Sequence, residues 1–349
     1  MPGAEAATTY AGAGVNVAAA HLATERLKTI VGQTRSEGVI ADVGPFAGLF
    51  SLGILSGYRE PVLVSSTDGV GTKIKVAGAL GRYDTIGHDL VNHCINDIAV
   101  HGARPLFFLD YLALNRVDPD LVATVVGGVA AACRTHGVAL LGGETAEMPD
   151  VYPAGEIDLA GFIVGIVDRE RAVLGHSVAL GDVLVGLPSS GLHTNGYTLA
   201  RRALPTESWD QVHPELGRTI GDALLEPHRC YLDEIQCLIG VGARAFAHIT
   251  GGGFPENVAR VLPPDLAASI DVSSWAPTPI FQLIAATGVT AREMYSVFNM
   301  GIGLVAVLPP DSVREAQRLV TDLVVIGNVT TRQRDEGVRL LNLDRALGA

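Results

Sequence analysis

Acidic, amide and imidazole side chains recur at helical spacing in one stretch of the sequence. Asp89, Asn92, His93, Asn96 and Asp97 would share one face of a helix, opposite an apolar face formed by Val91, Cys94, Ile95 and Ile98. A helix that only faces solvent usually carries Glu, Lys, Gln or Arg, because these residues form helices more readily than Asp, Asn or His. The spacing therefore favours a functional stripe over a solvated face.

Four short segments combine glycine with hydroxyl or acidic residues after apolar runs. They are 66–73 (STDGVGTK), 142–145 (GGET), 189–196 (SSGLHTNG) and 250–253 (TGGG). We expect each to precede a helix, where successive backbone N–H groups and the helix dipole attract phosphate. For any one segment an ordinary strand-to-helix turn is an equally good interpretation. Four in one chain indicate a polyanionic ligand.

Three acids accompany these segments. Asp68 lies beside Thr67, Thr72 and Lys73, which together offer a Mg²⁺ ligand, hydroxyls and a cation for phosphate oxygens, although Asp-Gly is also a common turn pair. We expect Asp110 and Glu144 at the ends of apolar strands, where α/β sheets usually bind ligands. The alternatives are a structural hydrogen bond for Asp110 and a favourable helix N-terminal charge for Glu144.

Two histidines flank glycine-rich segments. His193 has Ser190, Thr194 and Asn195 beside it, and His248 precedes 250–253. A loop histidine can move a proton near neutral pH or bind phosphate, although an isolated one is more often structural.

Several familiar sites are excluded by spacing. The segment 68–73 lacks the Walker pattern, and 12–14 (GAG) has no third glycine in register. His88 and His93 are five residues apart and no H-E-x-x-H occurs, which disfavours zinc. No G-x-S-x-G occurs, which disfavours acyl-enzyme hydrolysis. A nucleotide would have to bind by another scheme.

Strand-like and helix-like patterns alternate along the chain, which predicts an α/β or α+β protein. Predicted strands cover 62–65, 106–110, 159–167, 183–187, 301–308 and 324–329. Predicted helices cover 16–31, 84–101, 118–136, 194–203, 255–261 and 310–323. The charged, glycine-containing stretch 168–182 suggests a boundary near residue 172, which gives domains 1–171 and 172–349.

Composition narrows the class of protein. The 349 residues carry 25 Lys and Arg against 37 Asp and Glu, a net charge of −12 that argues against a nucleic-acid partner. The longest weakly polar run, 121–133, is too short to cross a bilayer, and no basic residue precedes Arg26, so neither a membrane span nor a secretory signal is expected. The four cysteines form no C-x-x-C pair, which predicts buried, reduced thiols in the cytoplasm.

The chain resembles phosphoribosylformylglycinamidine cyclo-ligases, the aminoimidazole ribonucleotide synthetase family. The resemblance runs nearly end to end through 66–73, 96–111 (NDIAVHGARPLFFLDY), 142–149 (GGETAEMP), 189–197, 248–263 (HITGGGFPENVARVLP) and 293–304 (EMYSVFNMGIGL). It implies two α/β domains, with N-terminal sheets of two subunits pairing into a shared barrel in a homodimer and a C-terminal α/β sandwich domain. The implied reaction closes the imidazole ring of formylglycinamidine ribonucleotide, using ATP and Mg²⁺.

The resemblance also assigns residues by matching position. It implies Asp68, Asp97 and Glu144 as Mg²⁺ ligands. The implied ATP contacts are Lys28, Thr67, Asp68, Thr72, Lys73, Asp97, Asp110, Gly142, Gly143 and Glu144. The implied contacts to the substrate are Ser190, Gly191, His193, Asn195, Gly196, Thr250, Gly251, Gly252 and Gly253. His193, Asp97 and Lys73 are the predicted catalytic residues.

Two segments depart from the family pattern. Residues 10–16 (YAGAGVN) lack acids that many members carry, and 43–48 (VGPFAG) contains a proline and an alanine where many have glycine. Both belong to the expected lid over ATP. Two alternatives remain at this point: another ATP-dependent member of the wider superfamily, and a nucleotide-binding dimer without turnover.

Overall fold

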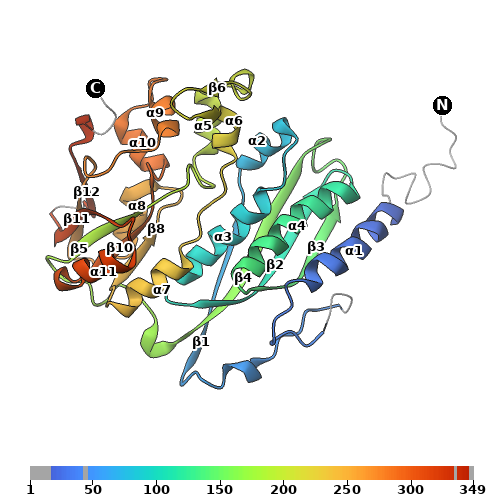
Figure 1. The fold of residues 1–349 in the computed structure, drawn as a ribbon, viewed down its shortest axis with the longest axis horizontal. Coiled ribbons are helices and arrows are strands. Elements are labelled where there is room, and N and C mark those ends of the chain that lie inside the picture. Colours follow the sequence, from blue (N-terminus) through green and yellow to red (C-terminus); the bar gives the residue numbers. More distant parts are fainter. Residues whose placement is uncertain (1–16, 42–45, 334–335, 346–349) are drawn as a thin grey trace. The chain divides into compact units, whose positions relative to one another are not determined.

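The computed structural model describes residues 17–41, 46–333 and 336–345, and these residues form two compact units (Figure 1). Among these described residues, the first unit contains those up to Cys94 together with Pro105–Ile166, and the second contains Ile95–Arg104 and those from Val167 onward. Helix α3 (Ile86–Ala99) therefore contributes residues to both units. Among the described helices, none is long and apolar enough to cross a membrane.

The first unit is a four-stranded sheet with helices packed on one side. The strand order is β1 (Pro61–Gly69), β4 (Ile157–Asp168), β2 (Arg104–Leu114), β3 (Ala139–Glu147). Helix α4 (Pro119–Thr135) packs against β3 and against α1 (Val17–Gly32), while α2 (Lys73–Leu80) follows β1. Pro119 at the first helical position and the Asp118 carboxylate, which accepts from the N–H groups of Asp120 and Leu121, start α4.

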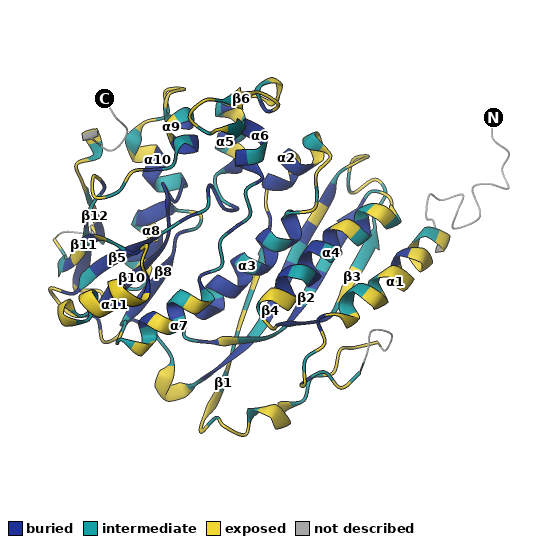
Figure 2. Cartoon of the chain, in the orientation of Figure 1, coloured by how far each residue is buried: buried dark blue, intermediate teal, exposed yellow. Residues whose placement is uncertain are grey.

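The two faces of this sheet differ in burial (Figure 2). Alternate residues of β4 are buried beneath the helices, as the period of a half-buried strand requires. Other positions of the sheet are exposed: Leu63 on β1 is 60% exposed, and Phe162 on β4 is 43% exposed. Large apolar side chains are therefore exposed on the sheet.

The second unit is built on a six-stranded sheet in the order β12 (Val338–Leu341), β9 (Leu266–Asp271), β11 (Val324–Thr331), β5 (Val183–Pro188), β10 (Ile302–Leu308), β8 (Ala245–His248). Its strand pairs are antiparallel except β12 with β9. Strand β10 is buried at every position and lies at the centre of a core containing Leu304, Phe246 and Tyr231.

Helices and a small hairpin complete the second unit. The helices are α5 (Tyr197–Ala203), α6 (Ile220–Leu224), α7 (Leu232–Gly240), α8 (Gly253–Arg260), α9 (Pro279–Ala285), α10 (Ala291–Val297) and α11 (Val313–Leu319). The hairpin joins β6 (Val212–His213) to β7 (Arg218–Thr219).

The structure confirms each predicted strand and helix as an element of that type, with shifted ends. One expected glycine turn is wrong, and a second, 66–73, precedes α2 as predicted although its first residues are in a strand. Gly142–Thr145 continues β3 instead of preceding a helix, and 66–69 belongs to β1. Asp110 and Glu144 therefore lie within strands β2 and β3 and do not end them. The last predicted helix ends at Leu319, and its first turn, Pro310–Ser312, is a 3₁₀ helix.

Candidate functional site

The polar stripe of α3 is not a solvent face. Asp89 and Asn96 are fully buried, His93 is buried, and Asn92 and Asp97 are half-buried. The prediction that the stripe is not a solvated face is confirmed, and its functional role stays a prediction. The stripe residues before Ile95 belong to the first unit, and Asn96 and Asp97 belong to the second.

The side chain of Lys73 is buried and does not face the solvent as a phosphate-binding residue would. Its ammonium lies 2.8 Å from the Asp89 carboxylate, and both side chains are completely buried. A buried ammonium paired in this way does not face a solvent-borne triphosphate, and separating the pair would leave an uncompensated charge. We therefore correct the catalytic, phosphate-binding interpretation of Lys73 to a structural ion pair that ties α2 to α3.

Asp68 remains accessible. It lies in β1 with its side chain 34% exposed, 3.5 Å from the His93 imidazole and 3.4 Å from the Ser66 hydroxyl. Thr67 and Thr72 on either side are exposed. This end of β1 presents a carboxylate and hydroxyls, as the sequence predicted, but its cation is turned inward.

Asp110 and Gly143 are register partners in the parallel pair of β2 and β3. A Cβ on Gly143 would overlap the Asp110 carboxylate, which explains the need for glycine there. Burial raises the pKa of Asp110 from 3.8 to about 7, and burial together with the Asp110 charge raises the pKa of the Cys133 thiol. The Asp110 carboxyl thus titrates near neutrality.

A cavity of about 290 Å³ lies beside the start of β3. Its walls combine the cations Lys28 and Arg35 with apolar side chains, namely Val31, Val39, Ala41, Leu140 and Leu141. Gly142 and Gly143 follow these leucines directly. Apolar walls with two cations suit a ligand that has both a flat ring and phosphates.

Glu144 is not brought to Asp68 within one chain. Glu144 is exposed on β3 and Asp68 lies on β1, at opposite edges of the sheet with β4 and β2 between them. At ~4.8 Å per strand spacing, the two backbones are roughly 14 Å apart. The expected metal set of Asp68 with Glu144 is therefore not assembled by a single chain.

In the second unit, the segment 189–196 forms the turn between β5 and α5. Asn299 holds it from below, since its amide nitrogen donates to the Gly191 carbonyl (2.8 Å) and its oxygen accepts from the Ser189 hydroxyl (2.9 Å). The Ser190 hydroxyl donates to the Pro227 carbonyl, while Asn195 and Gly196 are half-buried. Gly196 has φ 78°, and a Cβ there would overlap Phe298.

The segment 250–253 leads into α8, as predicted. The buried amide of Asn257 donates to the carbonyls of Thr250, Gly251 and Gly253. Gly252 and Gly253 have φ values of 90° and 56°. The Gly253 N–H donates to the Thr250 carbonyl (3.0 Å), and Thr250, Gly251 and Gly252 stay partly exposed just before α8, a position that suits a phosphate site.

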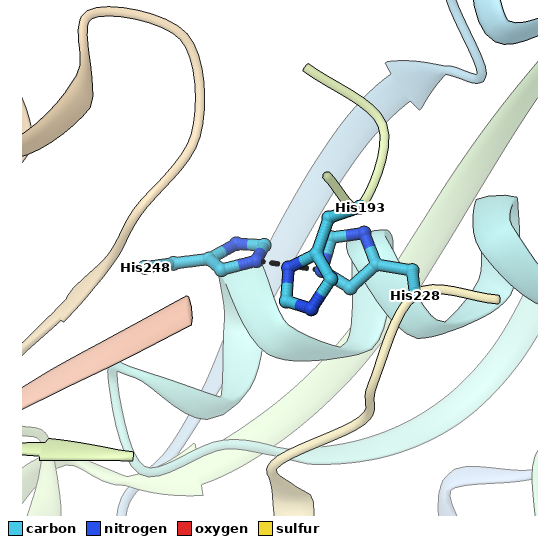
Figure 3. A group of neighbouring side chains, drawn as sticks. All are labelled: His193, His228 and His248. Atoms are coloured by element: carbon cyan, nitrogen blue, oxygen red, sulfur yellow. Dashed lines mark hydrogen bonds between the residues drawn. The ribbon is translucent and has the colours of Figure 1, made fainter. Parts of the chain in front are cut away.

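Three buried histidines meet beside these turns (Figure 3). The rings of His193 and His228 are stacked, with centroids 3.9 Å apart and 18° between planes. His228 Nε2 lies 3.0 Å from His248 Nε2, and His248 Nδ1 lies 2.7 Å from the Asp97 carboxylate. His193 and His248 were predicted; His228 was missed, because a single histidine in an irregular segment carries no pattern.

The cysteines are only partly as expected. Cys94 and Cys133 are buried, Cys230 is half-buried, and Cys237 is exposed on α7. The prediction that all four are buried is wrong for Cys237, whose position on a short amphipathic helix could not be read from spacing alone.

Comparison with known proteins identifies the family. Residues 52–167 match the N-terminal domain of AIR synthase related proteins, and residues 179–339 match their C-terminal domain. This chain belongs to the AIR synthase related family.

Relatives within the AIR synthase related family are similar over nearly their whole length. The chain is 50% identical to a phosphoribosylformylglycinamidine cyclo-ligase of Bifidobacterium animalis subsp. lactis over 89% of this chain and 92% of that one. It is 47% identical to the enzyme of that name from Desulfitobacterium hafniense, over 95% and 99%.

Among solved structures, HypE of E. coli has a TM-score of 0.68 at 18% identity, covering 93% of this chain and 94% of that one. The thiamine-monophosphate kinase of Stenotrophomonas maltophilia has a TM-score of 0.66 at 20% identity, covering 90% and 94%. At these identities the two structures establish the shared fold.

Proposed function

We propose that this chain catalyses the ATP-dependent ring closure of formylglycinamidine ribonucleotide to 5-aminoimidazole ribonucleotide, with release of ADP and phosphate. The main support for this proposal is the 45–50% identity to cyclo-ligases across most of both chains. The likeness to HypE, one structure of which was solved in complex with ATP, agrees with ATP as the cosubstrate.

The reaction needs activation of a poor leaving group. ATP phosphorylates the formyl oxygen of the substrate, the substrate's own amidine nitrogen attacks the activated carbon, and phosphate departs. Such a transfer depends on positioning and on neutralising charge, and it requires no protein nucleophile. Ring closure is intramolecular, so holding the substrate folded supplies much of the rate.

For ATP, the cavity beside β3 offers the most suitable place in the first unit. Lys28 and Arg35 supply cations and the Val and Leu side chains supply an apolar wall. Gly142 and Gly143 complete the proposed contacts on β3. Thr67 and Thr72 lie at the opposite edge of the sheet, with Asp68, and we propose that they reach the same ATP from a partner subunit. Asp110 is proposed to affect ATP binding indirectly, because its carboxylate lies against Gly143.

For Mg²⁺, Asp68 and Asp97 are the proposed ligands. Their side chains are 34% and 26% exposed and supply the carboxylate oxygens that this cation prefers. When bound, the ion would neutralise charge on the transferred phosphoryl group. Since Glu144 lies at the far edge of the sheet, we propose that it contributes only from a partner subunit.

The substrate's ribose phosphate is assigned to the turns 189–196 and 250–253. Ser190, Gly191, Asn195 and Gly196 form the first, and the Thr250 and glycine N–H groups form the second. His193, buried against the first turn, is proposed to move a proton or to bind phosphate.

We also propose a homodimer, which exposed apolar side chains of the first unit support. Leu63 and Phe162 are large apolar side chains on neighbouring strands of the sheet, and covering them with the same face of a second copy would remove them from water. A cytoplasmic location stays a prediction from the sequence.

The test is incubation of purified protein with formylglycinamidine ribonucleotide, ATP and Mg²⁺, with aminoimidazole product and ADP measured together. Equal amounts of both are expected. ADP without product would indicate a different phosphoryl acceptor, and neither would indicate a binding protein without turnover. Asp68→Asn and Asp97→Asn should each reduce turnover at least a hundredfold without unfolding the chain, whereas Asp120→Asn, on the surface of α4, should not.

A further inference from the structure

His228 makes more contacts than an accidental core histidine needs. It lies in the irregular segment between α6 and α7 and is 1% exposed. The residues after it are clamped to α3 by one amide, since Asn96 Oδ1 accepts from the Tyr231 N–H (2.8 Å) and Asn96 Nδ2 donates to the Arg229 carbonyl (2.9 Å). The backbone therefore delivers the His228 ring to a fixed place.

The amide of Asn96 selects one tautomer of His228. Because a backbone N–H can only donate, the bond from Tyr231 fixes the Asn96 oxygen, and the Asn96 amide nitrogen must then donate to His228 Nε2 (3.3 Å). With Nε2 accepting, the proton of a neutral ring lies on Nδ1. There it donates to the Thr194 hydroxyl (3.3 Å). Because the Asp97 carboxylate accepts from His248 Nδ1, His248 Nε2 is the donor to His228 when the His248 ring carries both protons.

The ring face supports His193. His193 has φ 61°, a left-handed conformation that residues with a side chain rarely adopt, so its neighbours must hold it there. His228 stacks on one side, the Ser190 N–H donates to His193 Nε2 (3.3 Å), and a Cβ on Gly303 would overlap the His193 ring. His228 thus touches both residues, His193 and Thr194, at the bend of the proposed substrate turn.

A metal site does not fit this cluster. The nitrogens of His193, His228 and His248 lie within 4.8 Å of one another. Lone pairs of an imidazole lie in the ring plane, so the stacked rings of His193 and His228 point theirs nearly parallel and do not converge on one ion. The contacts to Thr194, Asn96 and Asp97 also use nitrogens of His228 and His248.

We propose that His228 is a positioning residue for the reaction: its Nδ1–H tautomer and stacked face hold His193 and Thr194 in place, and through His248 it links this turn to Asp97. This rests on the proposed function, in which the turn binds the ribonucleotide substrate. His228 itself touches no reacting atom.

The tautomer is tested without any activity. Protein labelled with ¹⁵N at histidine, and compared with His228→Gln to assign the signals, should show His228 protonated at Nδ1 and bare at Nε2. The opposite tautomer would overturn the proposal, as would stoichiometric, submicromolar binding of Zn²⁺ in calorimetry that His228→Gln abolishes. Both measurements stand even if ring closure is not the chain's reaction.

Kinetics test the positioning. His228→Phe keeps a flat ring and loses both hydrogen-bonding nitrogens; it should lower kcat/KM for the ribonucleotide about tenfold and leave the KM for ATP unchanged. In a His193→Ala background the same change should cost less than twofold, because His228 acts through His193. An equal loss in both backgrounds, or a matching rise in the KM for ATP, would show general damage instead. His176→Phe, on an exposed ring, is the control.

Discussion

At the scale of single residues, environment decides what an ionisable side chain can do. Lys73 and Asp68 are close in sequence, yet the ammonium is completely buried against Asp89 while the carboxylate keeps a third of its surface exposed. The sequence shows both as polar residues of one loop. Only the fold separates a structural ion pair from a group that can meet a ligand.

Lys73→Met should lower the free energy of unfolding by about 3–5 kcal/mol, because it leaves the Asp89 charge buried without its ammonium. Lys75→Met on the same helix breaks only a half-exposed pair with Glu156 and should cost less than about 1 kcal/mol. Urea unfolding measures both, and a Lys73→Met protein as stable as wild type would contradict the buried pair.

The raised pKa of Asp110 predicts that the stability of the fold depends on pH. Its pKa is raised by burial from 3.8 to about 7, so between these values the folded state holds a proton that the unfolded state releases. Unfolding free energy should therefore fall as pH rises from about 4 to about 7 and stay lower above.

Asp110→Asn removes this effect. Urea unfolding of ligand-free protein should show the variant and wild type similar at about pH 4 and below, where the carboxyl is protonated in both states. The variant should be more stable at pH 8 by a few kcal/mol, since one pKa unit corresponds to ~1.4 kcal/mol. Asp120→Asn, 86% exposed, is the control. Identical pH profiles for wild type and Asp110→Asn would refute the shift.

At the scale of elements, strand register positions the glycines. Parallel pairing of β2 with β3 sets Gly143 opposite Asp110, where a Cβ would overlap the carboxylate, whereas a Cβ on Gly142 would meet only Leu109 Cδ2 at 3.7 Å. The two neighbouring glycines therefore have different reasons to be glycine.

Gly143→Ala should destabilise the chain by about 1–3 kcal/mol, because the strand or Asp110 must shift, and should weaken ATP binding. Gly142→Ala should change stability by less than about 1 kcal/mol. Thermal unfolding and calorimetric ATP titration measure the pair. Equal effects of the two substitutions would show that the register contact does not matter.

Elements with strong periodicity could be predicted, and those without it could not. The helices around Asp89 and Val125 and the apolar strand at 302–308 follow from spacing and capping residues. The strand before Glu144 was expected to end too early because the second half of β3, GGETAE, resembles a turn, and pairing with β2 overrides that local preference.

Among the site residues, too, those in a local sequence pattern could be predicted and those without one could not. His193, Asp97 and the turns at 189–196 and 250–253 could be singled out because glycine and polar residues cluster there. His228 and Asn96 come together across the sequence, 132 residues apart, and such a contact leaves no local signal. Side-chain direction, which turned Lys73 inward, is likewise set by packing.

At the scale of the whole molecule, the exposed apolar side chains of the first sheet argue for self-association. Leu63→Glu with Phe162→Glu should convert a dimer into monomers, because charges would replace apolar side chains in the proposed interface. Leu180→Glu, 65% exposed in the second unit, should leave the dimer intact. Sedimentation velocity measures this, and a double variant that still sediments as a dimer would place the interface elsewhere.

In the proposed reaction, ATP activates the formyl oxygen before the ring closes. The direct measurement uses substrate labelled with ¹⁸O at the formyl group, with ATP and Mg²⁺, and mass analysis of the released phosphate. We expect one ¹⁸O atom in each phosphate formed, in step with aminoimidazole product. Product accompanied by unlabelled phosphate would contradict the account, since the oxygen would then have left by another route.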